Sequence, residues 1–322
     1  MSNPIESPRS GQPGRLRISG LVTALITPLT PQGALDEQGL ERLVERQVTA
    51  GVDALFVLGS VGEGPLVSDG VYERVARRAA SLVAGRCQLL GGASDNSADR
   101  CLARLDVLAR AGVQFGVLTL PFYGWPAQPE HTVRFFSEVA ARSPVPVVVY
   151  NLPKAVGWQI PGEILEMLFQ IPNVVGIKDT HNDLAAMVRV ASSALRPPHF
   201  AYLPGNTSFG ARLLESGADG LVCTPANVFP EPFVALIRHH RAGRLDLVRR
   251  MDAELIPKLT TLLQLLPTGA ASIKAFLEAD GVCGRHTVRP WPELGDADLS
   301  ACRRLLEEMR AAIATFNGAT NS

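Results

Sequence analysis

Asn173-Val174-Val175-Gly176-Ile177-Lys178-Asp179-Thr180 is a short, mostly apolar run that begins directly after Pro172. Such runs are typical of strands buried in a parallel sheet, where a lysine is rare. An amine held partly out of water loses part of its preference for the charged form, and a free amine attacks carbonyl carbons to form Schiff bases. Lys178 is therefore the first candidate for chemistry. A lysine that pairs with Asp179, or that extends its amine to the surface, is the alternative.

A second strand signal precedes the first by one structural unit. The apolar run Val145–Val149 (VPVVV) leads directly into Tyr150–Pro153 (YNLP). Tyr150 and Lys178 are 28 positions apart, which fits one strand-helix-strand crossover in a parallel sheet. The sequence therefore predicts that a phenol and an amine face the same edge of the sheet.

A repeated pattern of helix termination organises the rest of the chain. Gly51, Gly112 and Gly217 each stand where a helix needs a left-handed terminator, and an apolar run begins a few residues later. Strands are expected near residues 20–26, 54–58, 88–92, 115–120, 145–150, 173–178, 199–203 and 220–223.

Eight strands that alternate with helices favour a closed (β/α)8 TIM barrel over an open doubly wound sheet, which is the alternative. The barrel is expected over residues 18–243. Beyond about Leu245 the strand signals stop, and the apolar periodicity predicts a C-terminal helical extension over 244–322. Residues 1–17 are rich in Ser, Pro, Gly and Arg, which is typical of a disordered N-terminal tail.

Composition narrows the class of protein. The 322 residues include 46% hydrophobic and 19% charged residues, and the formal net charge is zero. Nothing here attracts nucleic acid or an acidic membrane over long range, and no apolar run is long enough to span a bilayer. The five cysteines form no Cys-x-x-Cys pair, which favours reduced thiols and a cytoplasmic location.

Polar and glycine residues follow several of the expected strands, on the edge where a barrel carries its active site. The turn Gly59–Pro65 (GSVGEGP) is able to point backbone N–H groups at an anion; an ordinary strand-to-helix connection is the alternative. Tyr150 is a candidate proton relay, against the alternative of a packed tyrosine. Gly205 and Asn206 follow the seventh strand, where Asn206 either contacts substrate or caps a helix, the role that we favour.

These motifs together resemble the dihydrodipicolinate synthase and N-acetylneuraminate lyase superfamily of Schiff-base aldolases and lyases. The resemblance runs from about Gly20 to Pro292. The motifs that carry it are Thr27-Pro28, Gly59-Ser60-Val61-Gly62-Glu63, Tyr150-Asn151-Leu152-Pro153 and Gly176-Ile177-Lys178-Asp179, in the order and spacing of the family.

The resemblance implies a role for each of these positions. Lys178 forms an imine with pyruvate or a pyruvate-derived keto acid, Tyr150 is the general acid/base, and the Ser60 hydroxyl hydrogen-bonds that tyrosine. Tyr123 matches a second tyrosine that a neighbouring subunit inserts, which implies a homotetramer built as a dimer of dimers. The amides of Ser60 and Val61 bind the carboxylate, and no cofactor is implied.

Two departures from the family pattern bear on the reaction. Val61 replaces a hydroxyl residue, and Ala155 stands where dihydrodipicolinate synthases keep an arginine for the carboxylate of the aldehyde. A methyl group cannot replace a guanidinium fork. Ala155 and the Gly64-Pro65 turn are more similar to the sugar-acid aldolases, such as 2-keto-3-deoxygluconate aldolase. We therefore expect reversible cleavage of a 2-keto-3-deoxy or 4-hydroxy-2-keto acid to pyruvate and an aldehyde.

Other functions remain as alternatives to this expectation. A sugar-acid dehydratase and a true dihydrodipicolinate synthase would use the same imine. A metal-dependent aldolase is disfavoured because the histidines form no ligand set, and pyridoxal phosphate on Lys178 would colour the protein yellow. A non-catalytic keto-acid sensor would have no need for a proton relay.

Overall fold

The computed structural model describes residues 17–123, 128–264 and 269–320. Eight parallel strands form one sheet in which neighbours follow chain order and β1 also pairs with β8. The strands are β1 (Gly20–Ala24), β2 (Ala54–Val57), β3 (Gln88–Gly92), β4 (Phe115–Leu118), β5 (Val147–Asn151), β6 (Val174–Asp179), β7 (Ala201–Pro204) and β8 (Gly220–Cys223). The expected TIM barrel is confirmed, because each strand overlaps a run singled out in the sequence.

The barrel is nearly closed, and Asp219 bridges the gap between β7 and β8. The Asp219 N–H donates to the Tyr202 carbonyl oxygen at 3.0 Å. The Asp219 carboxylate accepts the Tyr202 N–H at 2.8 Å and Arg196 Nη1 at 2.6 Å. Asp219 therefore links β7 to β8, between which the described residues form no ladder of backbone hydrogen bonds.

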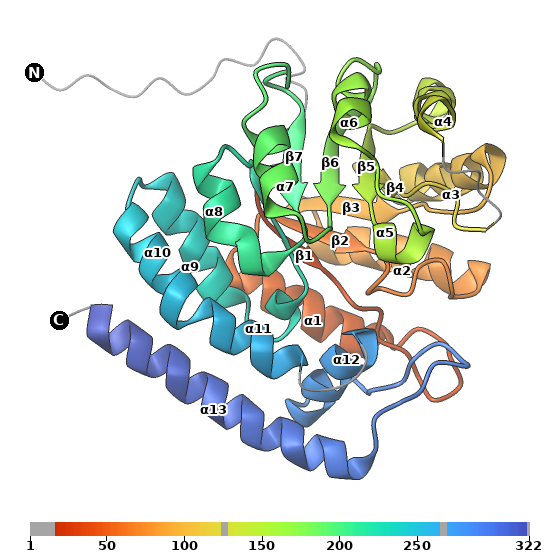
Figure 1. The fold of residues 1–322 in the computed structure, drawn as a ribbon. Helices are drawn as coiled ribbons and strands as arrows, with labels where there is room; N and C mark the ends of the chain where they lie inside the picture. The colour runs from red at the N-terminus through yellow and green to blue at the C-terminus, as the bar shows by residue number, and fades with distance from the viewer. Residues whose placement is uncertain (1–16, 124–127, 265–268, 321–322) are drawn as a thin grey trace, which may run out of the picture.

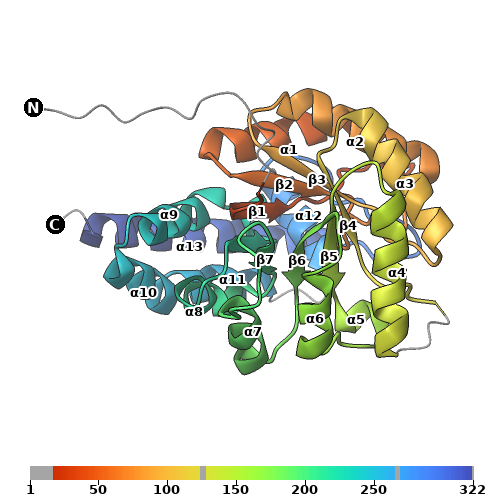
Figure 2. The ribbon, with the colours of Figure 1, turned by 90° about the horizontal axis from the view of Figure 1, so that it is seen from above.

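Helices alternate with the strands and surround the barrel, as Figure 2 shows from above. Those around the barrel are α1 (Glu37–Ala50), α2 (Asp69–Val83), α3 (Ala98–Ala111), α4 (Pro129–Arg142), α5 (Pro153–Val156), α6 (Gly162–Leu168), α7 (Leu184–Ala191), α8 (Gly210–Glu215) and α9 (Pro230–Arg241), with 3-10 turns η1 (Thr207–Phe209) and η2 (Pro225–Asn227). Gly51 and Gly112 end α1 and α3 with φ of 85° and 87°, the left-handed conformation that the sequence predicts there.

Two layers of apolar side chains hold the barrel. The larger layer fills the space between strands and helices. The smaller one fills the barrel interior, and its members include Val22, Phe56, Leu90, Phe115, Val148, Tyr150 and Leu203. Side chains alternate between the two layers along each strand. Consequently, a polar side chain at an interior position is held among apolar groups.

The C-terminal segment is helical, as the sequence predicts. It consists of α10 (Leu245–Glu254), α11 (Ile256–Gln264), α12 (Gly269–Ala279) and α13 (Asp296–Thr320). In Figure 1 the arrowheads of β5, β6 and β7 point toward the side of the molecule where α12 lies, and the long α13 runs beneath it. α12 and α13 therefore lie on the side of the barrel to which the strands deliver their carboxyl ends.

The N-terminal segment for which the sequence predicts disorder lies outside the described residues, except for Arg17, which pairs with Asp219. No helix in the described ranges is long and apolar enough to cross a membrane.

Candidate active site

Lys178 lies at the penultimate position of β6, with its amine inside the barrel. Its Nζ is 4.0 Å from the ring centroid of Tyr150 and 4.9 Å from that of Phe56. The residue is only 6% exposed, and the strand register places it directly opposite Tyr150. The alternative of an amine extended to the surface is therefore excluded.

Asp179 points away from Lys178, because neighbouring side chains of a strand face opposite sides. Its carboxylate accepts hydrogen bonds from the Tyr202 hydroxyl at 2.8 Å and the Asn151 amide at 2.9 Å, and His181 Nε2 lies 3.3 Å away. These contacts tie the ends of β5, β6 and β7 together. The alternative in which Asp179 neutralises Lys178 is also excluded.

Tyr150 stands between the amine and the turn that follows β2. Its hydroxyl lies 3.3 Å from Ser60 Oγ. Burial alone would raise the pKa of Tyr150, but the nearby Lys178 ammonium and the hydrogen bond with Ser60 outweigh it and hold the pKa below the usual range of tyrosine. A phenol in this setting gives up its proton more readily than one in water, as a proton relay requires.

The turn after β2 presents unused hydrogen-bond donors beside these groups. Within the part of the chain that the structure describes, the N–H groups of Ser60 and Val61 have no acceptor, whereas those of Glu63 and Gly64 bond back to Ser60 and Gly59. Two adjacent free amides form a concave donor site for an anion such as a carboxylate. The Val61 side chain is partly buried and packs against the core.

Gly205 keeps open a space beside the amine. A Cβ atom at this position would lie 2.2 Å from Thr180 Oγ1 and 3.2 Å from Lys178 Cε. Thr180 Oγ1 is buried beside Tyr150 and helps to lower the pKa of that phenol. Sequence reasoning did not place Thr180 beside the amine, although its position two residues after Lys178 puts both side chains on one face of the strand.

Two predicted site residues lie apart from this cluster. Asn206 caps η1 by accepting the Ser208 N–H at 3.1 Å, and its amide donates to the Asn182 side chain at 3.0 Å. Its contacts are therefore those of a helix cap, the role favoured above. Tyr123 follows β4 at the surface, where its side chain is 84% exposed, and Asn96 Oδ1 accepts its backbone N–H at 2.9 Å. Within one chain, Tyr123 is directed to solvent.

A pocket of about 190 Å³ begins at Ser60. Its walls come from the turn after β2, the start of α12 and the segment that follows α12; they include Leu66, Ala271, Thr287 and Trp291. The pocket is therefore bounded in part by the C-terminal segment. On another side of the rim, Lys154 and Ala155 are exposed on α5.

The chain matches a known family over most of its length. The sequence profile of the Dihydrodipicolinate synthetase family matches residues 17–309. A 4-hydroxy-tetrahydrodipicolinate synthase from Xanthomonas campestris pv. campestris is 34% identical over 243 residues, which cover 74% of this chain and 78% of that protein.

Solved structures show the same fold over nearly the whole chain. The crystal structure of dihydrodipicolinate synthase from Thermotoga maritima has a TM-score of 0.85 at 28% identity and covers 91% of this chain and 99% of that one. YagE, a prophage protein of this family from E. coli K12 in complex with pyruvate, has a TM-score of 0.84 at 25% identity and covers 91% and 98%. The chain therefore belongs to the dihydrodipicolinate synthetase family and is a carbon–carbon lyase of the class I aldolase type.

Proposed function

We propose that this enzyme reversibly cleaves a 2-keto-3-deoxy acid, or a related 4-hydroxy-2-keto acid, to pyruvate and an aldehyde through an imine on Lys178. The observation that carries the proposal is the buried Lys178 amine 4.0 Å from the Tyr150 ring, with the free amides of Ser60 and Val61 nearby. A nucleophile, a proton relay and an anion site are the three groups that this reaction needs.

Each group has a defined task in the reaction. The Lys178 amine attacks the C2 carbonyl, and loss of water gives a protonated imine. The Tyr150 phenolate takes the proton of the C4 hydroxyl, the C3–C4 bond breaks, and its electron pair moves toward the imine nitrogen to give an enamine while the aldehyde leaves. The enamine then takes a proton at C3, and water releases pyruvate and the free amine.

The aldehyde is the point on which the candidate activities differ. Relatives of this chain are named 4-hydroxy-tetrahydrodipicolinate synthase, which favours the synthase alternative, in which pyruvate would condense with aspartate semialdehyde. Against this, the exposed position 155 carries a methyl group, and a methyl group offers no bidentate partner to a second carboxylate. We therefore place the sugar-acid aldolase first and the synthase second.

A panel of aldehydes separates these activities. Pyruvate consumption is measured with aspartate semialdehyde, glyceraldehyde, glycolaldehyde, glyoxylate, N-acetylmannosamine and aromatic aldehydes at equal concentrations. We expect the highest kcat/KM with an uncharged hydroxyaldehyde. A preference for aspartate semialdehyde would establish the synthase instead, and elimination of water from a 2-keto-3-deoxy acid without pyruvate release would establish a dehydratase.

We further propose that the enzyme is a cytoplasmic homotetramer, a dimer of dimers, in which Tyr123 completes the proton relay of a neighbouring subunit. The support is the exposure of Tyr123 and of the adjacent Phe122 on the surface of one chain. Large exposed aromatic side chains are typical of interfaces.

Subunit mixing tests whether Tyr123 acts across an interface. Tyr123→Phe and Lys178→Met are each expected to be nearly inactive alone. When they are refolded together, roughly a quarter of the wild-type activity should return, because half of randomly formed dimers are mixed and each contains one complete site. The release of pyruvate is the measurement.

The matched control mixes Lys178→Met with Tyr150→Phe. Tyr150 and Lys178 belong to the same chain's site, so no mixed dimer contains a complete one and activity should stay low. Full activity of Tyr123→Phe alone, or no gain on mixing it with Lys178→Met, would refute the proposed role of Tyr123.

Gly205→Ala tests the space beside the amine. The added methyl group would come too close to Thr180 Oγ1, so the Thr180 or Lys178 side chain must move. We expect imine formation to slow by about 10²-fold, the usual cost of a misplacement of about 1 Å at a reacting group. The rate at which borohydride traps pyruvate measures the effect; Gly162→Ala, which has open space around it, is the control. Equal trapping rates in the wild-type enzyme, Gly205→Ala and Gly162→Ala would contradict this account of Gly205.

A further inference from the structure

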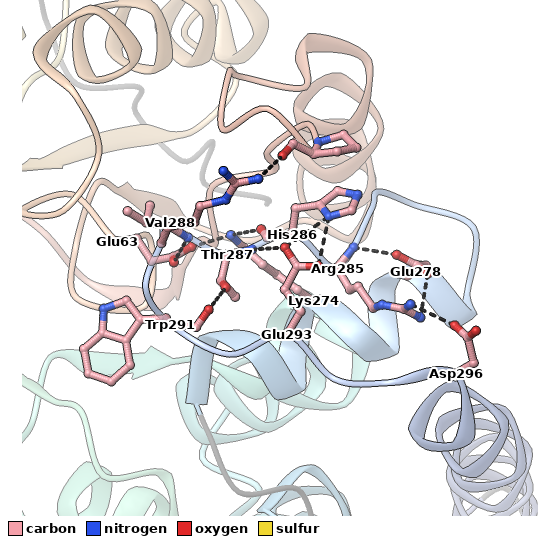
Figure 3. A network of polar contacts seen from close by, with 12 residues as sticks. Glu63, Lys274, Glu278, Arg285, His286, Thr287, Val288, Trp291, Glu293 and Asp296 are labelled. Carbon is pink, nitrogen blue, oxygen red and sulfur yellow. Dashed lines mark hydrogen bonds and ion pairs between the residues drawn. The ribbon is translucent and has the colours of Figure 1, made fainter.

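A buried ion pair joins the turn after β2 to the C-terminal segment. Lys274 on α12 donates to the carboxylate of Glu63, which is three residues beyond Ser60. The side chains of Lys274 and Glu63 are 0% and 4% exposed. Figure 3 shows the two side chains pointing toward each other, with the segment around His286 and Val288 beside them. The pair therefore links parts of the chain that are 211 positions apart.

The remaining polar atoms of the pair bind the segment that follows α12. Lys274 Nζ also donates to the His286 carbonyl oxygen at 2.7 Å, and Glu63 Oε1 accepts the Val288 N–H at 2.8 Å. Burial lowers the pKa of Lys274 more strongly than the adjacent Glu63 carboxylate raises it. Both side chains are therefore held in one geometry by partners on each side.

Such a pair is not explained by stability alone. Two charges lose their hydration when they are buried, and well-packed apolar residues of similar volume often give equal or greater stability. A fully bonded polar pair, by contrast, specifies one arrangement of the segments that it joins. What the Glu63–Lys274 pair specifies is the position of the turn.

The turn needs this support because of its backbone. Glu63 has a φ of 54°, in the left-handed region that is unfavourable for residues with a side chain. The Thr27 hydroxyl also donates to the Gly62 carbonyl oxygen at 2.5 Å. The turn is thus held at Gly62 by Thr27 and at Glu63 by Lys274, directly after Ser60 and Val61.

We propose that Glu63 and Lys274 are positioning residues that aim the backbone N–H groups of Ser60 and Val61 at the carboxylate of the keto acid. This inference rests on the proposed function, because it assumes that the two amides bind that carboxylate. The charged groups are bonded to each other and to the backbone of the segment 286–288, so neither is assigned a contact with the substrate. Their effect is transmitted through the backbone from Glu63 to Ser60, and it makes keto-acid binding depend on α12 and the segment 286–288.

The test compares Lys274→Met with the double variant Glu63→Gln/Lys274→Met. Lys274→Met leaves an uncompensated buried carboxylate and is expected to destabilise the fold, whereas the double variant removes both charges and restores most of the lost stability. We expect the pyruvate concentration that half-saturates borohydride trapping at Lys178 to rise about tenfold or more in both, the usual effect of misaligning a hydrogen bond to a charged group.

Two comparisons distinguish a change in the orientation of the Ser60 and Val61 amides from a loss of fold stability. Acetone has the ketone of pyruvate but no carboxylate, so its rate of trapping at Lys178 should be the same in the variants as in the wild-type enzyme. Arg196→Met breaks the bonds to Asp219 where β7 and β8 meet, and it should lower the melting temperature without changing the half-saturating pyruvate concentration.

The outcomes distinguish this inference from the proposed function. A wild-type protein that traps no pyruvate on Lys178 would overturn both. Trapping by the wild-type enzyme with an unchanged half-saturating concentration in the folded double variant, or an equal loss of acetone and pyruvate trapping, would overturn the positioning role alone.

Discussion

Lys178→Met is expected to abolish turnover, with a loss of roughly 10⁴-fold or more, because removal of the nucleophile from an enzyme that works through a covalent intermediate removes most of its rate enhancement. Methionine keeps the unbranched shape of the side chain and its contacts with the Tyr150 and Phe56 rings. The fold should therefore survive, and only the amine is lost. Release of pyruvate from the keto acid with the highest kcat/KM is the measurement.

The control for this variant is Lys154→Met. Lys154 is a lysine on α5, at the same rim of the barrel, but it is exposed. Its substitution should leave turnover within the scatter of the assay. Residual turnover of Lys178→Met near the wild-type rate, with a normal melting temperature, would contradict the covalent route.

Tyr150→Phe is expected to separate the two halves of the reaction. The ring contacts with Lys178 and Phe56 remain, so pyruvate should still form the imine, whereas cleavage of the carbon–carbon bond should slow by about 10²- to 10⁴-fold, the usual contribution of a positioned acid or base. Single-turnover cleavage and borohydride trapping, measured on the same preparation, give the two rates.

Tyr72→Phe is the matched control for the loss of a buried hydroxyl. The Tyr72 hydroxyl donates to the Gly92 carbonyl oxygen at 2.7 Å and belongs to the layer between strands and helices. Its loss should lower stability by about 1 kcal/mol without slowing cleavage. Equal cleavage rates for Tyr150→Phe and the wild-type enzyme would refute the role of Tyr150 as the proton relay.

Most of the fold is predictable from local sequence signals. Gly51 and Gly112 are left-handed helix terminators in the structure, and the apolar runs between such signals are the strands. These features depend on residues that are near one another in the chain. The gap between β7 and β8 was not predictable, because Asp219 bridges it through contacts with Arg196 and Tyr202 that local patterns do not encode.

The centre of the candidate site is predictable from the order of the strands. Tyr150 and Lys178 stand at the penultimate positions of the neighbouring strands β5 and β6, so the topology alone brings them together, and the turn after β2 opens on the same rim. Position along a strand also decides that Asp179 faces away from the amine. The role that we propose for Tyr123 depends on a second chain, which one sequence does not place.

The Glu63–Lys274 pair shows where prediction from sequence stops. Lys274 lies on an amphipathic helix and Glu63 in a turn, and nothing in either segment indicates the other. Their contact depends on how the C-terminal segment packs against the end of the barrel. The place of Thr180 beside the amine was missed for a different reason: its spacing from Lys178 is informative only once the direction of the Lys178 side chain is known.

Reduction of the protein with borohydride in the presence of pyruvate, followed by mass spectrometry of its peptides, shows whether Lys178 forms the imine. We expect the mass of one reduced pyruvate on the peptide that contains Lys178, and its absence from the same peptide of Lys178→Met. No added mass at pyruvate concentrations that support turnover, or a label confined to other lysines, would contradict this expectation.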